Sequence, residues 1–210
     1  MKYPNAYKGV KNIATGILLE VIIAIIGIVV VILARPGADA NSVAAAGTLG
    51  LVVLIASIVA FIFELVGLFQ AKKDEGSFTT ALWMILFSII ISLAGVACSF
   101  IPAAAILANP ICSILVDACR VVMMLSIIGG IANLAEKSNE GEFANSGRVL
   151  RMVLLGLFLM GLVLQIISSF VVNPTAASIM LAFAIIAGVV EIVADIWLVI
   201  YLLRAPRKIK

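Results

Sequence analysis

Six ionisable side chains lie within stretches of sequence that are otherwise almost entirely apolar. They are Glu20, Glu64, Asp117, Arg120, Glu191 and Asp195. Carboxylates in an apolar setting can exchange protons or hold small cations, and an arginine among them supplies a counter-charge. We therefore treat these six residues as the candidate binding site for an ion or a small solute.

The stretches around these residues are typical of a membrane protein. Of 210 residues, 64% are hydrophobic and 12% are charged, whereas a soluble domain is about half apolar and about a quarter charged. Because about 20 apolar residues cross a bilayer as a helix, we predict one all-α membrane domain over residues 1–210. Its six helices are expected at 13–34, 48–69, 81–100, 111–134, 149–172 and 177–203.

Basic residues predict the orientation of these helices in the bilayer. Twelve of the fourteen Lys and Arg residues fall on one side of the six-helix arrangement, at the two termini and in or beside two polar loops. Of the other two, Arg35 falls on the opposite side and Arg120 lies inside a helix. The positive-inside rule then places both termini in the cytoplasm. The first apolar run is too long for a signal peptide and contains Glu20, so we expect it to remain as a membrane helix.

A polar phrase occurs twice, as KKDEGSF at 72–78 and as KSNEGEF at 137–143. In addition, VADIWLVIYLLRA at 193–205 aligns without gaps with VAFIFELVGLFQA at 59–71. These matches predict three tandem hairpins of the same orientation, at 7–71, 78–136 and 143–205. The alternative is that loops facing one compartment share a composition by chance.

Each copy of the polar phrase also leads to predictions about the conformation of its loop. We expect its glycine to supply the turn, and a following Ser, Thr or Asn to cap the next helix. We expect Phe78 and Phe143 to lie at the level of the lipid headgroups, where aromatic rings anchor well.

The hairpin layout and the loop phrase [DN]-E-G-x-F resemble small multi-pass membrane proteins predicted in Firmicutes genomes. The resemblance covers most of the chain and implies a bacterial cytoplasmic membrane, but those proteins have no assigned function. The layout is also similar to that of mitochondrial carriers, although their helix motif P-x-[DE]-x-x-[KR] is absent. The layout of six helices in 210 residues is also similar to that of the substrate-binding subunits of energy-coupling-factor vitamin transporters, but no sequence motif is shared with them.

The absence of histidine excludes several kinds of chemistry. Zinc metalloproteases need histidine ligands and serine hydrolases need an imidazole base. We expect no enzyme activity, cofactor or resident metal, and no nucleic-acid partner. Cys98 and Cys112 would allow a disulfide in an oxidising compartment, whereas the alternative is that both, with Cys119, are small buried side chains.

Depth brings several of the six ionisable residues together. At 1.5 Å rise per residue, Glu20, Glu64 and Asp195 each lie about 8–12 Å from the cytoplasmic edge of their helices. Glu191 lies one turn beyond Asp195 on the same helix face. Three acids on three helices therefore form one predicted layer, with a fourth acid next to it.

Two interpretations of the charged residues remain open. In the first, the acids form a chamber open to the cytoplasm that binds a proton or small cation, with Arg120 as counter-charge. In the second, Asp117 and Arg120 form a salt bridge that fixes helix packing, while Glu20 and Glu64 extend to the nearby interface.

The corresponding hypotheses for function are also two. The first is small-solute or ion transport, or solute binding, through the acidic layer. The second is a non-transporting scaffold or regulatory subunit, with a protein partner or a second copy bound through helix faces such as the small pair Ala56 and Ala60.

Overall fold

The computed structural model describes residues 2–33, 40–170, 193–194 and 196–209. Its helices are α1 (Pro4–Leu33), α2 (Ala40–Ala71), α3 (Ser77–Ser99), α4 (Pro102–Lys137) and α5 (Gly141–Phe170). Residues 193–194 and 196–208 are also helical, and none of the described residues forms a strand. The predicted all-α class is confirmed for the described part of the chain.

In the described part of the chain, five helices contain a stretch that is long and apolar enough to cross a membrane. These stretches are Pro4–Gly27, Ala44–Ala71, Ser77–Ser99, Ile111–Lys137 and Gly141–Val163. They support a multi-pass membrane protein, as composition predicted. Most of the sixth expected run, 177–203, lies outside the described residues, and its described end is helical.

Two connections are shorter than the sequence indicated. The segment 101–110, between the helices expected at 81–100 and 111–134, was expected to connect them, but α4 begins at Pro102, so Phe100 and Ile101 alone separate it from α3. Proline fits the first turn of a helix because its missing N–H has no partner there in any case. In the segment 35–47, α2 already begins at Ala40.

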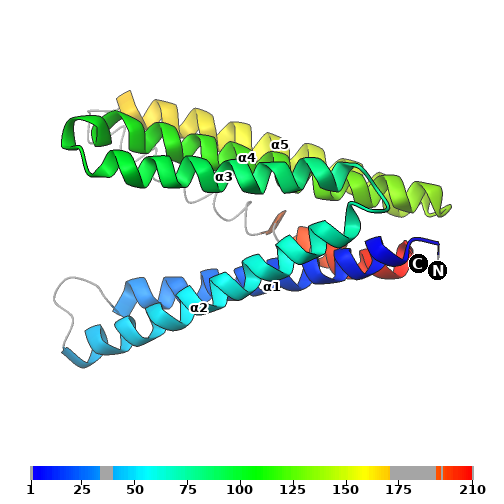
Figure 1. Cartoon of the computed structure of the whole chain (residues 1–210), viewed down its shortest axis with the longest axis horizontal. Helices are drawn as coiled ribbons and strands as arrows, with labels where there is room; N and C mark the ends of the chain where they lie inside the picture. The colour runs from blue at the N-terminus through cyan, green and yellow to red at the C-terminus, as the bar shows by residue number, and fades with distance from the viewer. Residues whose placement is uncertain (1, 34–39, 171–192, 195, 210) are drawn as a thin grey trace.

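The helices form two layers, one of α1 and α2 and the other of α3, α4 and α5 (Figure 1). The layers meet at the end that carries both termini and the loops at 72–76 and 138–140, and they diverge toward the opposite end. We call the first of these the basal end. Large apolar side chains such as Ile25, Leu51 and Ile90 are exposed, which suits helices that face lipid.

Glycines hold α1 and α2 in close contact. A Cβ atom on Gly9 would lie 2.6 Å from the backbone nitrogen of Ala71, and one on Gly67 would lie 2.6 Å from the carbonyl oxygen of Gly9. One on Gly16 would lie 2.9 Å from the carbonyl oxygen of Ala60. These distances leave no room for a side chain, so the two backbones touch. Such close approach is a main source of helix association in lipid.

The loops differ from the local expectations in three ways. Gly76 has a helical φ of −64°, and α3 has no side-chain cap, so neither the turn nor the cap was predicted correctly. Phe78 is fully buried rather than at headgroup level, because a gap at Gly130 receives its ring. Phe143 instead stacks on Tyr201, with 4.5 Å between ring centroids.

The left-handed residue of the second loop is Asn139, with a φ of 61°. The amide of Asn139 donates to the carbonyl of Glu136, and the amide of Glu140 to the carbonyl of Ala135. This pattern is a Schellman motif, which closes α4. In the first loop, the amide of Glu75 donates to the carbonyl of Ala71. The hydrogen bond from the glutamate amide to an alanine carbonyl therefore spans four residues in the first loop and five in the second.

Polar contacts at the basal end join the first residues of one helix to the last residues of its neighbour. Asp74, after α2, accepts hydrogen bonds from the Asn5 side chain at 3.1 Å and the Ala6 amide at 2.7 Å, at the start of α1. Glu75, before α3, pairs with Lys137 at the end of α4. In each of these two contacts the partners are about sixty to seventy residues apart in sequence. We call the contacts basal clamps.

A third basal clamp joins Glu140, before α5, to Lys208 in the C-terminal helical segment, at 2.9 Å. Each clamp therefore closes the base of one antiparallel helix pair. The three contacts stabilise the basal end, where the two layers meet.

The Glu75 clamp predicts a pH dependence. Burial alone would raise the pKa of Glu75, but hydrogen bonds from Lys137, Asn133 and Ser77 and the charge of Lys137 outweigh it and hold the pKa below 4.5. A carboxyl whose pKa is lower in the folded state stabilises the fold above its unfolded pKa. This contribution is lost as the pH falls through the folded value.

We expect Glu75→Gln to lower the free energy of unfolding by up to about 1 kcal/mol at neutral pH. The variant and the wild type should converge as the pH falls below 4.5. Thermal unfolding in detergent across that range measures this, with Glu142→Gln, an exposed acid in the first turn of α5, as control. A Glu75→Gln curve parallel to the wild type at every pH would contradict the expectation.

The glycine contact gives a second prediction. Gly67→Ala should lower the free energy of unfolding by about 1–3 kcal/mol, because the added methyl group overpacks the contact with α1. Gly50→Ala in the same helix is the matched control, since a Cβ atom there has nothing within 4 Å. Thermal unfolding of both variants in one detergent is the measurement, and equal stabilities would show that α1 and α2 separate easily.

Candidate functional site

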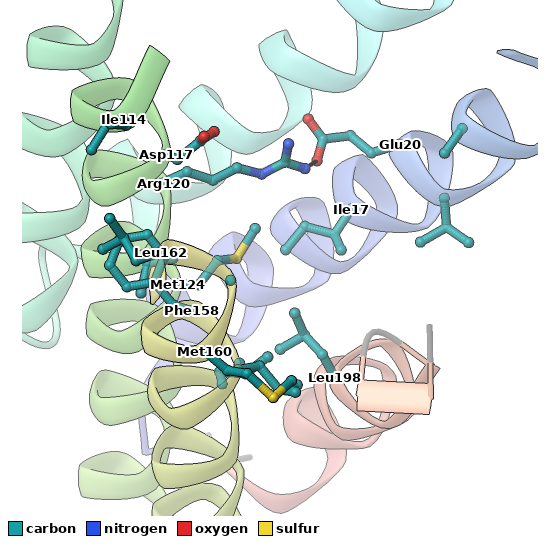
Figure 2. Close-up of a pocket in the computed structure, with 16 residues that line it drawn as sticks. Ile17, Glu20, Ile114, Asp117, Arg120, Met124, Phe158, Met160, Leu162 and Leu198 are labelled. Carbon is teal, nitrogen blue, oxygen red and sulfur yellow. Dashed lines mark hydrogen bonds and ion pairs between the residues drawn. The ribbon is translucent and has the colours of Figure 1, made fainter. Parts of the chain in front are cut away.

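A cavity of about 590 Å³ lies between α1, α4, α5 and the C-terminal helical segment. Three charged residues line it, Glu20 from α1 and Asp117 and Arg120 from α4. Most of the remaining wall is apolar and includes Ile17, Met124, Phe158, Met160 and Leu198 (Figure 2). A concave, mainly apolar site with a few polar groups is the usual form of a small-molecule pocket.

An ion pair links α1 to α4 at this cavity. The Nη2 atom of Arg120 lies 2.9 Å from the Oε2 atom of Glu20, and the two side chains extend toward each other (Figure 2). Glu20 lies eighteen residues from Lys2, and Arg120 lies seventeen residues from Lys137. Both are therefore about 25 Å from the basal end, where Lys2 donates a hydrogen bond to the carbonyl of Lys137.

The second of the two sequence interpretations paired Arg120 with Asp117, its neighbour by i,i+3 spacing, whereas the first made Arg120 the counter-charge of the acids. In the structure Arg120 instead donates a hydrogen bond to Glu20. An arginine side chain is long enough to reach a facing helix, and the i,i+3 spacing carried no information about that helix.

Asp117 lines the same cavity with an exposed side chain. Within the described part of the chain it forms no ion pair with Arg120, whose charge Glu20 balances. The three charged residues of the wall therefore carry a net charge of about −1 at neutral pH. The arrangement presents one uncompensated carboxylate beside a neutral pair, in a mainly apolar chamber.

Glu64 lies deeper than the cavity wall. Its residue is 4% exposed, and its Cγ atom lies 2.6 Å from where a Cβ atom on Gly16 would be. The Oε1 atom is buried and makes no hydrogen bond. Glu20 follows Gly16 by one turn of α1, so Glu64 is next to the ion pair without lining the cavity. The Glu20 side chain extends to Arg120, and Glu64 is buried against α1.

The other candidate positions do not add to this geometry. Glu191 and Asp195 lie outside the described residues. Cys98, Cys112 and Cys119 are free thiols. Within the described ranges, no group of three or more His, Cys, Asp or Glu side chains is placed to hold a metal ion.

The sequence did not indicate the apolar half of the site. Phe158 and Met160 lie in an apolar run whose composition is that of a lipid-facing helix, and Leu198 lies in another such run. The glycine at position 16 was a usable signal, because it stands seven residues after Gly9 on the same helix face. Together they mark the face of α1 that meets α2 and Glu64.

A mutant cycle tests the ion pair. Glu20→Gln and Arg120→Gln should each lower the thermal stability in detergent, because each removes one partner of the ion pair between α1 and α4. The double variant should be more stable than the sum of the single effects predicts, with a coupling free energy of about 1 kcal/mol. Strictly additive effects would show that the two side chains do not interact in the membrane protein.

Comparison of this chain with models of known protein families, with curated proteins and with solved structures gives no match.

Proposed function

We propose that this protein binds a small organic cation in the cavity and carries it across the membrane. The observation that supports this most is the Asp117 carboxylate, which has no ion-pair partner among the described residues and lies beside the Glu20–Arg120 pair. An ammonium group placed at Asp117 would neutralise the site. The apolar wall would at the same time cover the hydrocarbon part of the ligand.

The dimensions of the cavity fit this class of ligand. A volume of about 590 Å³ lies within the range of small-molecule sites, roughly 300–1,000 Å³. Aromatic and thioether side chains such as Phe158 and Met160 adapt well to an apolar body. Arg120 makes the site unfavourable for a ligand with two positive charges, so we propose a monovalent cation.

The proposal includes a six-helix architecture of three tandem hairpins. Burial supports it, because positions matched by the gapless alignment of 59–71 with 193–205 are buried in both segments. The matched buried pairs are Ala60 with Ala194, Glu64 with Leu198, Gly67 with Tyr201, Leu68 with Leu202, and Ala71 with Ala205. The three basal clamps, one for each proposed hairpin, are a second line of support.

We further propose a bacterial cytoplasmic membrane, with both termini on the cytoplasmic side. The distribution of Lys and Arg supports the orientation, since twelve of fourteen would lie at the basal end and its loops. The resemblance of the loop phrase supports the bacterial location.

The test uses three probes of similar shape: benzylammonium, benzyl alcohol and benzoate. Benzylammonium should raise the melting temperature of the purified protein, and the other two should not. Asp117→Asn should weaken benzylammonium binding by about tenfold or more, because a charge-assisted contact is worth about 1.4 kcal/mol or more. Glu142→Gln, at the basal end, is the control and should bind as the wild type does.

Uptake of radiolabelled benzylammonium into proteoliposomes then separates transport from binding alone. Binding without uptake would favour a non-transporting membrane subunit. Stabilisation by benzoate, or by none of the three probes, would overturn the proposed ligand class.

A further inference from the structure

Glu64 is a buried carboxyl group that the proposed ligand site does not use. It lies in the contact between α1 and α2, where Gly16 leaves space for its side chain. One of its oxygen atoms is buried without a hydrogen-bond partner. Its position corresponds to Leu198 in the gapless alignment, and Leu198 is buried as well. The site is therefore one that suits a neutral side chain.

The buried position of Glu64 indicates which protonation state the fold favours. An ionised carboxylate without a contacting cation or full hydrogen bonding is strongly unfavourable in an apolar interior. None of the four ion pairs in the described part of the chain includes Glu64. A proton on Glu64 removes the charge at once, whereas a change of packing would have to separate the touching backbones of α1 and α2.

We propose that Glu64 is a proton-binding site whose occupancy is linked to the Glu20–Arg120 pair at the cavity. The charged groups that act on Glu64 are Glu20 from α1 and Arg120 from α4. While Glu64 holds its proton, Arg120 remains with Glu20. When the proton leaves to water, the new carboxylate repels Glu20 and competes with it for Arg120.

This inference deepens the proposed function, because Arg120 also lines the ligand cavity. Loss of the proton would draw Arg120 away from Glu20, and so change the charge that a bound cation meets. A bound cation at Asp117 would in turn favour the ionised form of Glu64. By linkage, each ligand alters the affinity for the other to the same extent.

Infrared spectroscopy of the protein in liposomes tests the proton site directly. A protonated carboxyl group has a carbonyl-stretch band that a carboxylate lacks. We expect the wild type to show such a band at about pH 7 that disappears at higher pH. Glu64→Gln should lack the band, and Glu142→Gln should keep it.

Two further variants test the link to the ion pair. Arg120→Gln removes the neighbouring cation, so the band should persist to a higher pH, while Glu20→Gln removes the neighbouring anion, so the band should disappear at a lower pH. A merely structural Glu64 would show neither shift. Absence of the band from the wild type, or its persistence in Glu64→Gln, would overturn the proposal.

Glu64→Leu provides the residue found at the matched position and serves if the Gln variant does not fold. It should be folded, should lack the band, and should lose any effect of pH on benzylammonium affinity. If the band titrates as expected but no cationic probe binds, the proton site stands and the proposed ligand fails. If the probe binds and the band is absent, the proposed ligand stands and the proton site fails.

Discussion

The contact between the backbones of α1 and α2 is the constraint on which the site depends. In lipid, apolar side chains gain little by leaving their surroundings, so helices associate through close packing and polar contacts. Gly9, Gly16 and Gly67 permit that packing because they carry no side chain. The same contact covers Glu64 and orients the next turn of α1, so that Glu20 faces Arg120 on α4. The cavity and the buried carboxyl group thus both depend on α1.

The polar contacts of the molecule are divided between two levels. The three basal clamps occupy the end with both termini, where water and headgroups would lower their net contribution. The Glu20–Arg120 pair lies about 25 Å away along the helices, among side chains that are mostly apolar. There it interacts in a lower dielectric, so a change of one charge has a larger effect.

Composition and apolar run length were enough to predict an all-helical, multi-pass protein, because the bilayer permits few other structures for such a chain. They could not predict which side chains meet. In a soluble helix an apolar stripe marks the buried face, but in a membrane the lipid-facing side is apolar too, so Phe158 and Met160 gave no signal. The sequence left two roles open for Arg120, and it could not decide between them because spacing within α4 says nothing about α1. The local error at Phe78 arose because the gap at Gly130 exists only once α3 and α4 have packed.

The left-handed conformation of Asn139 bears on how such a chain can change over time. In both loops a glutamate reaches a lysine at the far end of its own helix pair, although the amide of that glutamate donates to an alanine four residues back in the first loop and five residues back in the second. Asn139, with its positive φ, accommodates the additional residue between alanine and glutamate. Asparagine tolerates this conformation better than most residues with a side chain. The segments that connect helices at this end of the molecule can therefore differ in length by a residue while the helices keep their register.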